Sequence, residues 1–118
     1  MANFNFNKVI LGGRITANPE LKSTPQGTPV LTFTLAMNRK LKTGESKAEF
    51  FRCRAWKERA EFISRYFQKG STMCLVGTLH AYEYEDKNGI KHDGVEVAVE
   101  EIYFVDGKEK TEDDIFGE

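Results

Sequence analysis

Residues 50–56 carry the most chemistry in this sequence, which reads Phe-Phe-Arg-Cys-Arg-Ala-Trp at that point. Because alternate side chains of a β-strand point to opposite faces, one face of this stretch is apolar and consists of Phe51, Cys53 and Ala55. The other face alternates aromatic rings with guanidinium groups, and its members are Phe50, Arg52, Arg54 and Trp56. Rings stack on unpaired bases while arginines neutralise phosphates. We therefore predict that this strand binds a single nucleic-acid strand.

An alternative interpretation places the same rings in a core or a subunit contact and leaves the arginines on a solvated surface. All four side chains share one strand face, so burying Phe50 and Trp56 would draw Arg52 and Arg54 inward. Burial of a charge without a partner is costly. The nucleic-acid interpretation is therefore favoured.

Two other groups are predicted to extend this surface. Tyr82 and Tyr84 share one face of a later strand with His80, so their rings would continue the stacking platform, although exposed tyrosines also occur on β-surfaces without this role. A basic loop would track a phosphate backbone or would simply be solvated, and its members are Arg39, Lys40 and Lys42.

Strands dominate the elements that must position these residues. Period-two alternation between turn signals predicts strands over residues 8–15, 29–38, 48–57, 72–84 and 92–105. Gly12-Gly13 marks a bend or bulge, residues 18–27 are a predicted loop, and Asn88-Gly89 is a predicted turn. Along the last strand Val95, Val97 and Val99 share one apolar face, but Ile102 and Phe104 continue it one residue out of phase, which predicts a bulge near Glu100-Glu101.

One helix is predicted over residues 58–69. Its apolar stripe consists of Phe62, Ile63, Tyr66 and Phe67. Glu58 and Glu61 near the start and Arg65 and Lys69 near the end match the helix dipole, and Gly70 is the predicted stop. Five strands with one helix between the third and fourth predict an all-β fold, the OB-fold, which is a five-stranded Greek-key barrel.

Charge and composition divide the chain into two parts. We expect one domain over residues 1–105 and a short, acidic, disordered tail over residues 106–118. The tail has a formal charge of -4 and the remainder +3, which is one signature of nucleic-acid-binding proteins. No stretch approaches the length of a membrane span and the N-terminus lacks the pattern of a signal peptide, so we expect a cytoplasmic protein.

Catalytic and metal-binding functions have little support in the sequence. Cys53 and Cys74 lie far apart without a Cys-x-x-Cys motif, so we interpret both as small buried apolar residues and expect no metal, cofactor or disulfide. A metal-dependent nuclease is the enzyme alternative, and its acidic candidates are Glu83, Glu85, Asp86 and Asp93. Neither cysteine has a nearby histidine that would make it a nucleophile. We expect no catalytic residues.

Over residues 7–105 the chain resembles the bacterial and phage single-stranded DNA-binding proteins. The matching stretches are Asn7-Lys8-Val9-Ile10-Leu11-Gly12-Gly13-Arg14, Asn18-Pro19-Glu20-Leu21, Thr32-Phe33-Thr34-Leu35-Ala36, Phe50-Phe51-Arg52-Cys53 with Trp56, and Lys69-Gly70-Ser71. The resemblance implies an OB-fold that usually assembles as a homotetramer. It also implies that the protein coats single-stranded DNA during replication, recombination and repair.

Residue roles follow from the resemblance position by position. The base-stacking aromatic residues of the family fall on Phe50, Trp56 and Tyr84, and a fourth position, Trp in some relatives, falls near Leu41. The first strand pairs subunits in the family, which implies an interface role for residues 9–14. His80 and His92 match no catalytic position of the family.

The C-terminal tail departs from the family pattern. Family members typically have a long linker that ends in acidic residues and a terminal Pro-Phe, which docks on partner proteins. Here the linker is nearly absent, Pro is missing and two residues follow Phe116. The resemblance still implies docking of replication and repair proteins on a segment made of Asp113, Asp114, Ile115 and Phe116.

A second binding function stays open on the residues alone. An RNA-binding or replication-restart accessory protein with the same fold would also use stacking and phosphate contacts. Discrimination between DNA and RNA depends on groups that sense the 2′-hydroxyl, and no residue in the sequence identifies them.

Overall fold

Six strands and one helix follow one another in residues 3–105, the part of the chain that the computed structural model describes. In chain order they are β1 (Val9–Ile15), β2 (Glu20–Ser23), β3 (Pro29–Lys40), β4 (Ser46–Trp56), α1 (Lys57–Tyr66), β5 (Thr72–Glu85) and β6 (Lys91–Phe104). The order of strands in the sheet is β1-β5-β6-β4-β3-β2.

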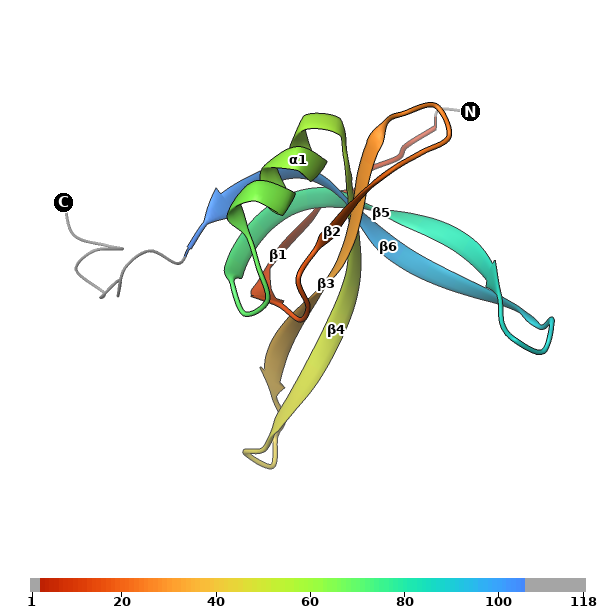
Figure 1. Cartoon of the computed structure of the whole chain (residues 1–118). Helices are drawn as coiled ribbons and strands as arrows, with labels where there is room; N and C mark the ends of the chain where they lie inside the picture. Colours follow the sequence, from red (N-terminus) through yellow and green to blue (C-terminus); the bar gives the residue numbers. More distant parts are fainter. Residues whose placement is uncertain (1–2, 106–118) are drawn as a thin grey trace.

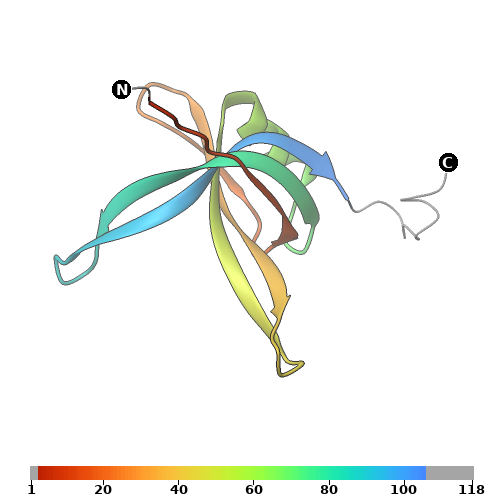
Figure 2. The same ribbon diagram turned by 180° about the vertical axis from the view of Figure 1, so that it is seen from behind.

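Five of these strands close into a barrel, because β1 pairs with β3 as well as with β5 (Figure 1). Arg14 and Ile15 of β1 face Ala36 and Leu35 of β3. Seen from behind, β1 runs along β5 before it reaches this seam (Figure 2). The predicted OB-fold barrel is confirmed, with one helix between β4 and β5, which are the third and fourth of the five barrel strands.

The barrel interior is filled by the inward face of each strand. Alternate residues of β3 and β4 are buried, as expected for strands with one face on a core. The fully buried larger side chains come from several elements, and they are Ile15, Leu31, Leu35, Cys53, Ile63, Met73, Leu75 and Val97. α1 packs against β3 and β4, away from the tips of both long hairpins (Figure 1).

The helix is shorter than predicted. It ends at Tyr66, and the residue after it, Phe67, is already extended. Gly70 does not stop the helix; its N–H donates to the carbonyl oxygen of Ile15 at 2.8 Å, in the turn that leads to β5. Tyr66 is 55% exposed, so only part of the predicted apolar stripe reaches the core, with Ile63 and Phe67 buried.

One expectation for the N-terminal third was wrong, and one of the two alternatives for Gly12-Gly13 is excluded. The predicted loop contains β2, an exposed strand that pairs with the first four residues of β3 and has no apolar alternation to reveal it. Gly12-Gly13 forms no bulge, since β1 and β5 pair without interruption from Val9 to Arg14. Gly13 instead lies at the barrel seam, where a Cβ atom would be only 2.6 Å from the carbonyl oxygen of Ala36.

The predicted bulge in the last strand is present. Gly77 of β5 pairs with Val99, whereas its neighbour Val76 pairs with Glu101. Glu100 is therefore the extra residue of β6, and the buried phase of the strand shifts by one position beyond it, as the sequence indicated.

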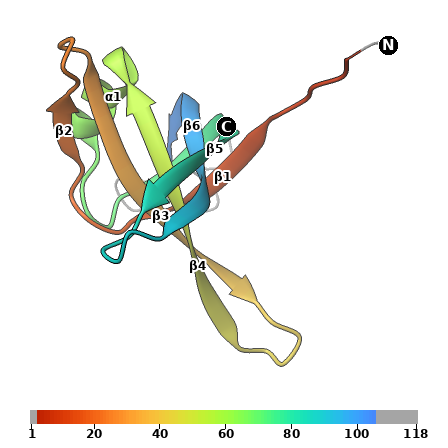
Figure 3. The same cartoon turned by 90° about the vertical axis from the view of Figure 1, so that its right-hand side faces the viewer.

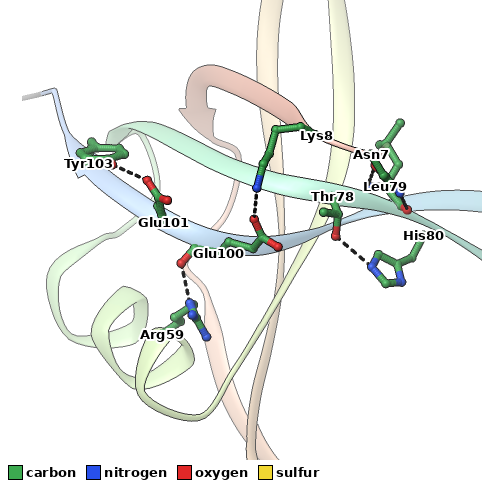
Figure 4. Close-up of polar contacts among 9 residues, drawn as sticks. All are labelled: Asn7, Lys8, Arg59, Thr78, Leu79, His80, Glu100, Glu101 and Tyr103. Carbon is green, nitrogen blue, oxygen red and sulfur yellow. Dashed lines mark hydrogen bonds and ion pairs between the residues drawn. The ribbon is translucent and has the colours of Figure 1, made fainter. Parts of the chain in front are cut away.

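Contacts from two sides hold this bulge in place (Figure 4). Lys8 Nζ donates to the Glu100 carboxylate at 2.9 Å, and Arg59 Nε of α1 donates to the Glu100 carbonyl oxygen at 2.6 Å. The hydrogen bond to Glu100 raises the pKa of Lys8. Asn7 adds a strand-like pair, since its side chain bonds both the N–H and the carbonyl of Leu79. The N-terminal segment, the helix and the last strand are thus tied together.

Two hairpins extend well beyond the barrel (Figures 1 and 3). We call residues 38–49 the β3–β4 arm and residues 82–93 the β5–β6 arm. The arms diverge because β4 and β6 pair at only two positions, Cys53 with Val97 and Arg54 with Ala98. The predicted turn of the second arm is confirmed, with Gly89 at φ 78° and its N–H bonded to the Asp86 carbonyl.

Candidate nucleic-acid interface

The two faces of β4 are as different as the sequence predicts. Cys53 and Ala55 are completely buried, while Phe51 is half-buried because it lies where β4 leaves the barrel. On the opposite face Phe50 is 63% exposed and Trp56 is half-buried. The rings of Phe50 and Trp56 are therefore accessible to a ligand rather than enclosed in a core.

Trp56 sits at the junction of β4 and α1. It is the N-cap residue of the helix, with extended backbone angles, and no side chain caps the helix there. The next residue, Lys57, has φ 59°, a left-handed conformation that costs a non-glycine residue about 1 kcal/mol. The backbone thus carries local strain immediately after Trp56.

Arg52 and Arg54 lie between the two rings and share one carboxylate. Arg52 Nε donates to Glu96 Oε1 at 3.0 Å, and Arg54 Nε lies 3.5 Å from Glu96 Oε2. The arginine side chains are 41% and 33% exposed, whereas the Glu96 side chain is 8% exposed. The guanidinium groups therefore keep access to solvent while their counter-ion is buried.

Sequence reasoning missed Glu96. A signal was present, because an acidic side chain lowers the cost of two arginines on a partly covered strand face. That acidic side chain is Glu96, which lies between Val95 and Val97. The alternation of valines in this strand predicts only its apolar face. Val97 and Val99 are buried as this face implies, but Val95 is 58% exposed because it lies close to the β5–β6 arm.

Tyr82 supports Arg52 from β5, which lies on the other side of β6 from β4. Its cross-strand partner is Gly94, where a Cβ atom would lie 2.6 Å from the tyrosine ring. The absence of a side chain at Gly94 therefore lets the ring lie against the sheet. The Arg52 guanidinium lies 5.0 Å from the ring centroid, which is a cation–π distance.

Tyr84 lies further along the β5–β6 arm and is 49% exposed. Its ring stacks on His92 of β6, with centroids 5.1 Å apart and planes at 19°. His92 Nε2 is 2.8 Å from Asp86 Oδ2, and this contact is the main reason that the pKa of Asp86 is lowered. A chain of side chains thus orders the Tyr84 ring and leaves it accessible.

The arginine pair and the two tyrosines line a surface depression of about 470 Å³. Its lining residues are Arg52, Arg54, Tyr82, Glu83, Tyr84 and Glu96. On the other side of β4, the residues of β3 that face this row are short or medium in size: Val30, Thr32, Thr34 and Ala36. The long side chains of β4 therefore extend further from the sheet than the shorter side chains of β3 beside them. This difference leaves room for the bases and the sugar-phosphate backbone of a nucleic-acid strand.

The predicted basic loop is a loop only in part, because Arg39 and Lys40 are the last residues of β3 and Lys42 lies in the turn that follows. Arg39 Nε donates to Glu49 at 2.8 Å, so its charge is partly offset. Lys40 and Lys42 are exposed, and Leu41 between them is half-buried. The β3–β4 arm therefore offers positive charge beyond the Phe50 end of the β4 row.

Neither cysteine lines this depression. Cys53 is buried, and burial raises the pKa of its thiol to about 12. Cys74 is only half-buried, contrary to expectation, because it lies on the outward face of β5. Within residues 3–105 no cluster of three metal-ligating side chains occurs, and no helix is long and apolar enough to cross a membrane. The predicted docking segment, residues 113–116, lies outside the described residues.

Comparison with known proteins places this chain in a family. The model of the single-strand binding protein family matches residues 6–105. The chain belongs to the single-strand binding protein family. The match includes every element from β1 to β6, and hence both arms and the arginine pair.

Individual relatives agree with the family match. The single-stranded DNA-binding protein 3 of Listeria innocua is 38% identical over 105 residues, which cover 87% of this chain and 66% of the relative. The single-stranded DNA-binding protein A of Bacillus subtilis is 39% identical over 86% of this chain and 60% of its own length. The single-stranded DNA-binding protein 2 of Staphylococcus aureus is 39% identical over 86% of this chain and 74% of its own length. The chain thus spans less than two thirds of the first two relatives.

Proposed function

We propose that this protein binds single-stranded DNA without sequence preference on the outer surface of β3 to β6. The observation that carries the proposal is the alternation of accessible rings with guanidinium groups along β4 from Phe50 to Trp56. Rings stack on any base and arginines contact any phosphate, so this arrangement needs no particular sequence. Family membership and the names of the relatives support DNA as the ligand.

We assign distinct roles to the site residues. Phe50, Trp56 and Tyr84 stack on bases, and Arg52 and Arg54 contact the phosphates between them. Tyr82 orders Arg52 and contributes a ring edge. The β3–β4 arm steers the strand through exposed charges, namely Arg39, Lys40 and Lys42. The protein acts by binding, protecting the strand in replication, recombination and repair, and it has no catalytic step.

Binding of labelled oligo-dT, oligo-U and duplex DNA, measured by fluorescence anisotropy, tests this function. We expect oligo-dT to bind most tightly and the duplex most weakly, because a paired base cannot stack on a ring. Tighter binding of oligo-U would favour the RNA-binding alternative. Tyr66→Ala is a suitable control, since Tyr66 is an exposed ring on α1, packed against Phe62 and Phe104 rather than in the depression.

A homotetramer is the proposed assembly, with residues 9–14 in the subunit contact. Its support is apolar exposure near β1, where Phe4, Phe6 and Ile10 are 88%, 80% and 67% exposed. Light scattering of the wild type and of Ile10→Glu would test this assembly. A wild-type mass of one chain, or no change in the variant, would contradict the proposed contact.

The acidic segment of residues 113–116 is proposed to dock replication and repair proteins, and the protein to act in the cytoplasm at the nucleoid. The support is the acidic run that ends in Ile115 and Phe116. A pull-down that compares the full chain with Phe116→Ala tests the docking. Identical partners for both chains would contradict it.

A further inference from the structure

Glu96 is a buried carboxylate on a surface that is proposed to bind a polyanion. Among the described residues, Glu96 is the one charged residue that is buried, with 7% of its surface exposed. A negative charge at this position opposes the approach of a phosphate and offsets part of the charge of the two arginines. Its burial also costs free energy. Net charge alone therefore gives no reason for a glutamate here.

The location of Glu96 supplies a reason. The short ladder between β4 and β6 begins at Cys53 and Val97, and Arg52 and Glu96 are the residues directly before it on the two strands. The two arms diverge from this point. The contact between Arg52 and Glu96 continues the connection between β4 and β6 by side chains where the backbone ladder ends.

The contact geometry leaves the outer ends of both arginines for a ligand. Both guanidinium groups face Glu96 through Nε, at 3.0 Å and 3.5 Å. The Nε atom of Arg54 is buried and has no hydrogen-bond partner among the described residues, so the ion pair with Glu96 is its polar contact there. A phosphate would be met by the Nη groups, which are the remaining donors of each fork.

We propose that Glu96 is a positioning residue for single-strand binding, which holds Arg52 and Arg54 in line between the rings of β4 and β5. This inference rests on the proposed function. Long side chains lose rotamer freedom when they bind a ligand, and an arginine that is already held loses less. The order that Glu96 imposes outweighs the charge that it cancels, so its removal weakens binding although the surface becomes more positive.

The sign of the effect tests the proposal. Glu83 lines the same depression but is exposed, and among the described residues it forms no ion pair with either arginine, so Glu83→Ala removes the same charge without the positioning. With labelled oligo-dT at low salt, we expect Glu83→Ala to bind as tightly as the wild type or more tightly. Glu96→Ala should bind about threefold or more weakly. Equal or tighter binding by Glu96→Ala would overturn the proposal.

A double-mutant cycle shows whether Glu96 acts through the arginines. In a background of Arg52→Ala and Arg54→Ala, Glu96→Ala should cause no further loss of affinity, because the groups that it positions are gone. A loss of the same size in both backgrounds would overturn the proposal, since a general structural defect gives that result.

A conservative variant covers the case in which Glu96→Ala fails to fold. The amide oxygen of Glu96→Gln still accepts from Arg52 Nε, but the charge that pairs with Arg54 is removed. We expect a smaller loss of affinity than for Glu96→Ala, and wild-type or tighter binding would overturn the proposal. If the wild type itself did not bind oligo-dT, the proposed function would fall and this inference with it. If only the variants behaved contrary to expectation, the inference alone would fall.

Discussion

The two arms of the molecule have similar backbones and opposite chemistry. Each is a long hairpin that leaves the barrel beside the β4–β6 contact (Figures 1 and 3). The β3–β4 arm, residues 38–49, has a formal charge of +2 and no aromatic side chain. The β5–β6 arm, residues 82–93, has a formal charge of -2 and contains Tyr82, Tyr84 and His92.

On the proposed function, this difference divides charge and stacking between the arms and combines them only on β4. Phosphate attraction acts over about 10 Å at moderate salt, so exposed lysines need no exact placement. A ring must meet a base face to face, and Tyr84 is accordingly held by His92 and Asp86. The row from Phe50 to Trp56 lies between the arms and contains both kinds of group on one strand face.

The largest expected effect is on the aromatic arm. Tyr84→Ala should weaken binding of oligo-dT by about 1–3 kcal/mol, because one base loses its stacking partner. The slope of log affinity against log salt should stay at its wild-type value, since no cation is removed. Anisotropy titrations at several salt concentrations measure both quantities. A changed slope with unchanged affinity would reverse the roles assigned to the two arms.

A smaller effect is expected on the basic arm, and it should have the opposite signature. The double substitution Lys40→Ala and Lys42→Ala should reduce the salt slope by about 0.7 for each phosphate that the variant no longer neutralises. Affinities of variant and wild type should converge as salt is added, because screening removes this contribution in both. The same titrations provide the test. If the variant's deficit persisted in high salt, these lysines would act through something other than charge.

The smallest effect concerns the turn that supports Tyr84. The side chain of His92 lowers the pKa of Asp86, and the N–H groups of Ile90 and Asn88 add to this effect. A carboxyl with a lowered folded pKa stabilises the folded state above its usual value of 3.8, and this contribution is lost as the pH falls through the folded pKa. His92→Ala should raise the pKa of Asp86 towards 3.8.

Carbon-detected NMR titration of Asp86 measures this pKa directly. Lys91→Ala is the matched control, because Lys91 lies beside His92 and is not among the causes of the lowered pKa. An Asp86 pKa that is the same in wild type and His92→Ala would show that the turn backbone alone sets it.

The sequence predicts the β4 surface well because the relevant information is local. Alternation along one strand decides which side chains share a face, and Phe50 and Cys53 lie on opposite faces as this rule requires. The bulge at Glu100 was also predictable, since a slip in the apolar phase marks it. Both depend on neighbours in the chain and not on the rest of the fold.

Features that depend on distant contacts could not be read in this way. β2 is exposed on all four residues and exists because it pairs with the edge of β3, which no local pattern records. The role of Glu96 depends on a parallel contact between β4 and β6, 44 residues apart at the Arg52 pair. The helix ends early because Phe67, the residue after Tyr66, is extended and buried in the core.

Intrinsic fluorescence tests the stacking role of β4 most directly, because Trp56 is the only tryptophan in the chain. Its half-buried ring lies at the end of the row that begins at Phe50, so a base that stacks on it must change its emission. Addition of oligo-dT should quench the tryptophan fluorescence strongly and in a saturable manner, at the same concentrations at which anisotropy reports binding. An emission spectrum that stays unchanged while anisotropy shows the oligonucleotide to be fully bound would contradict stacking on Trp56.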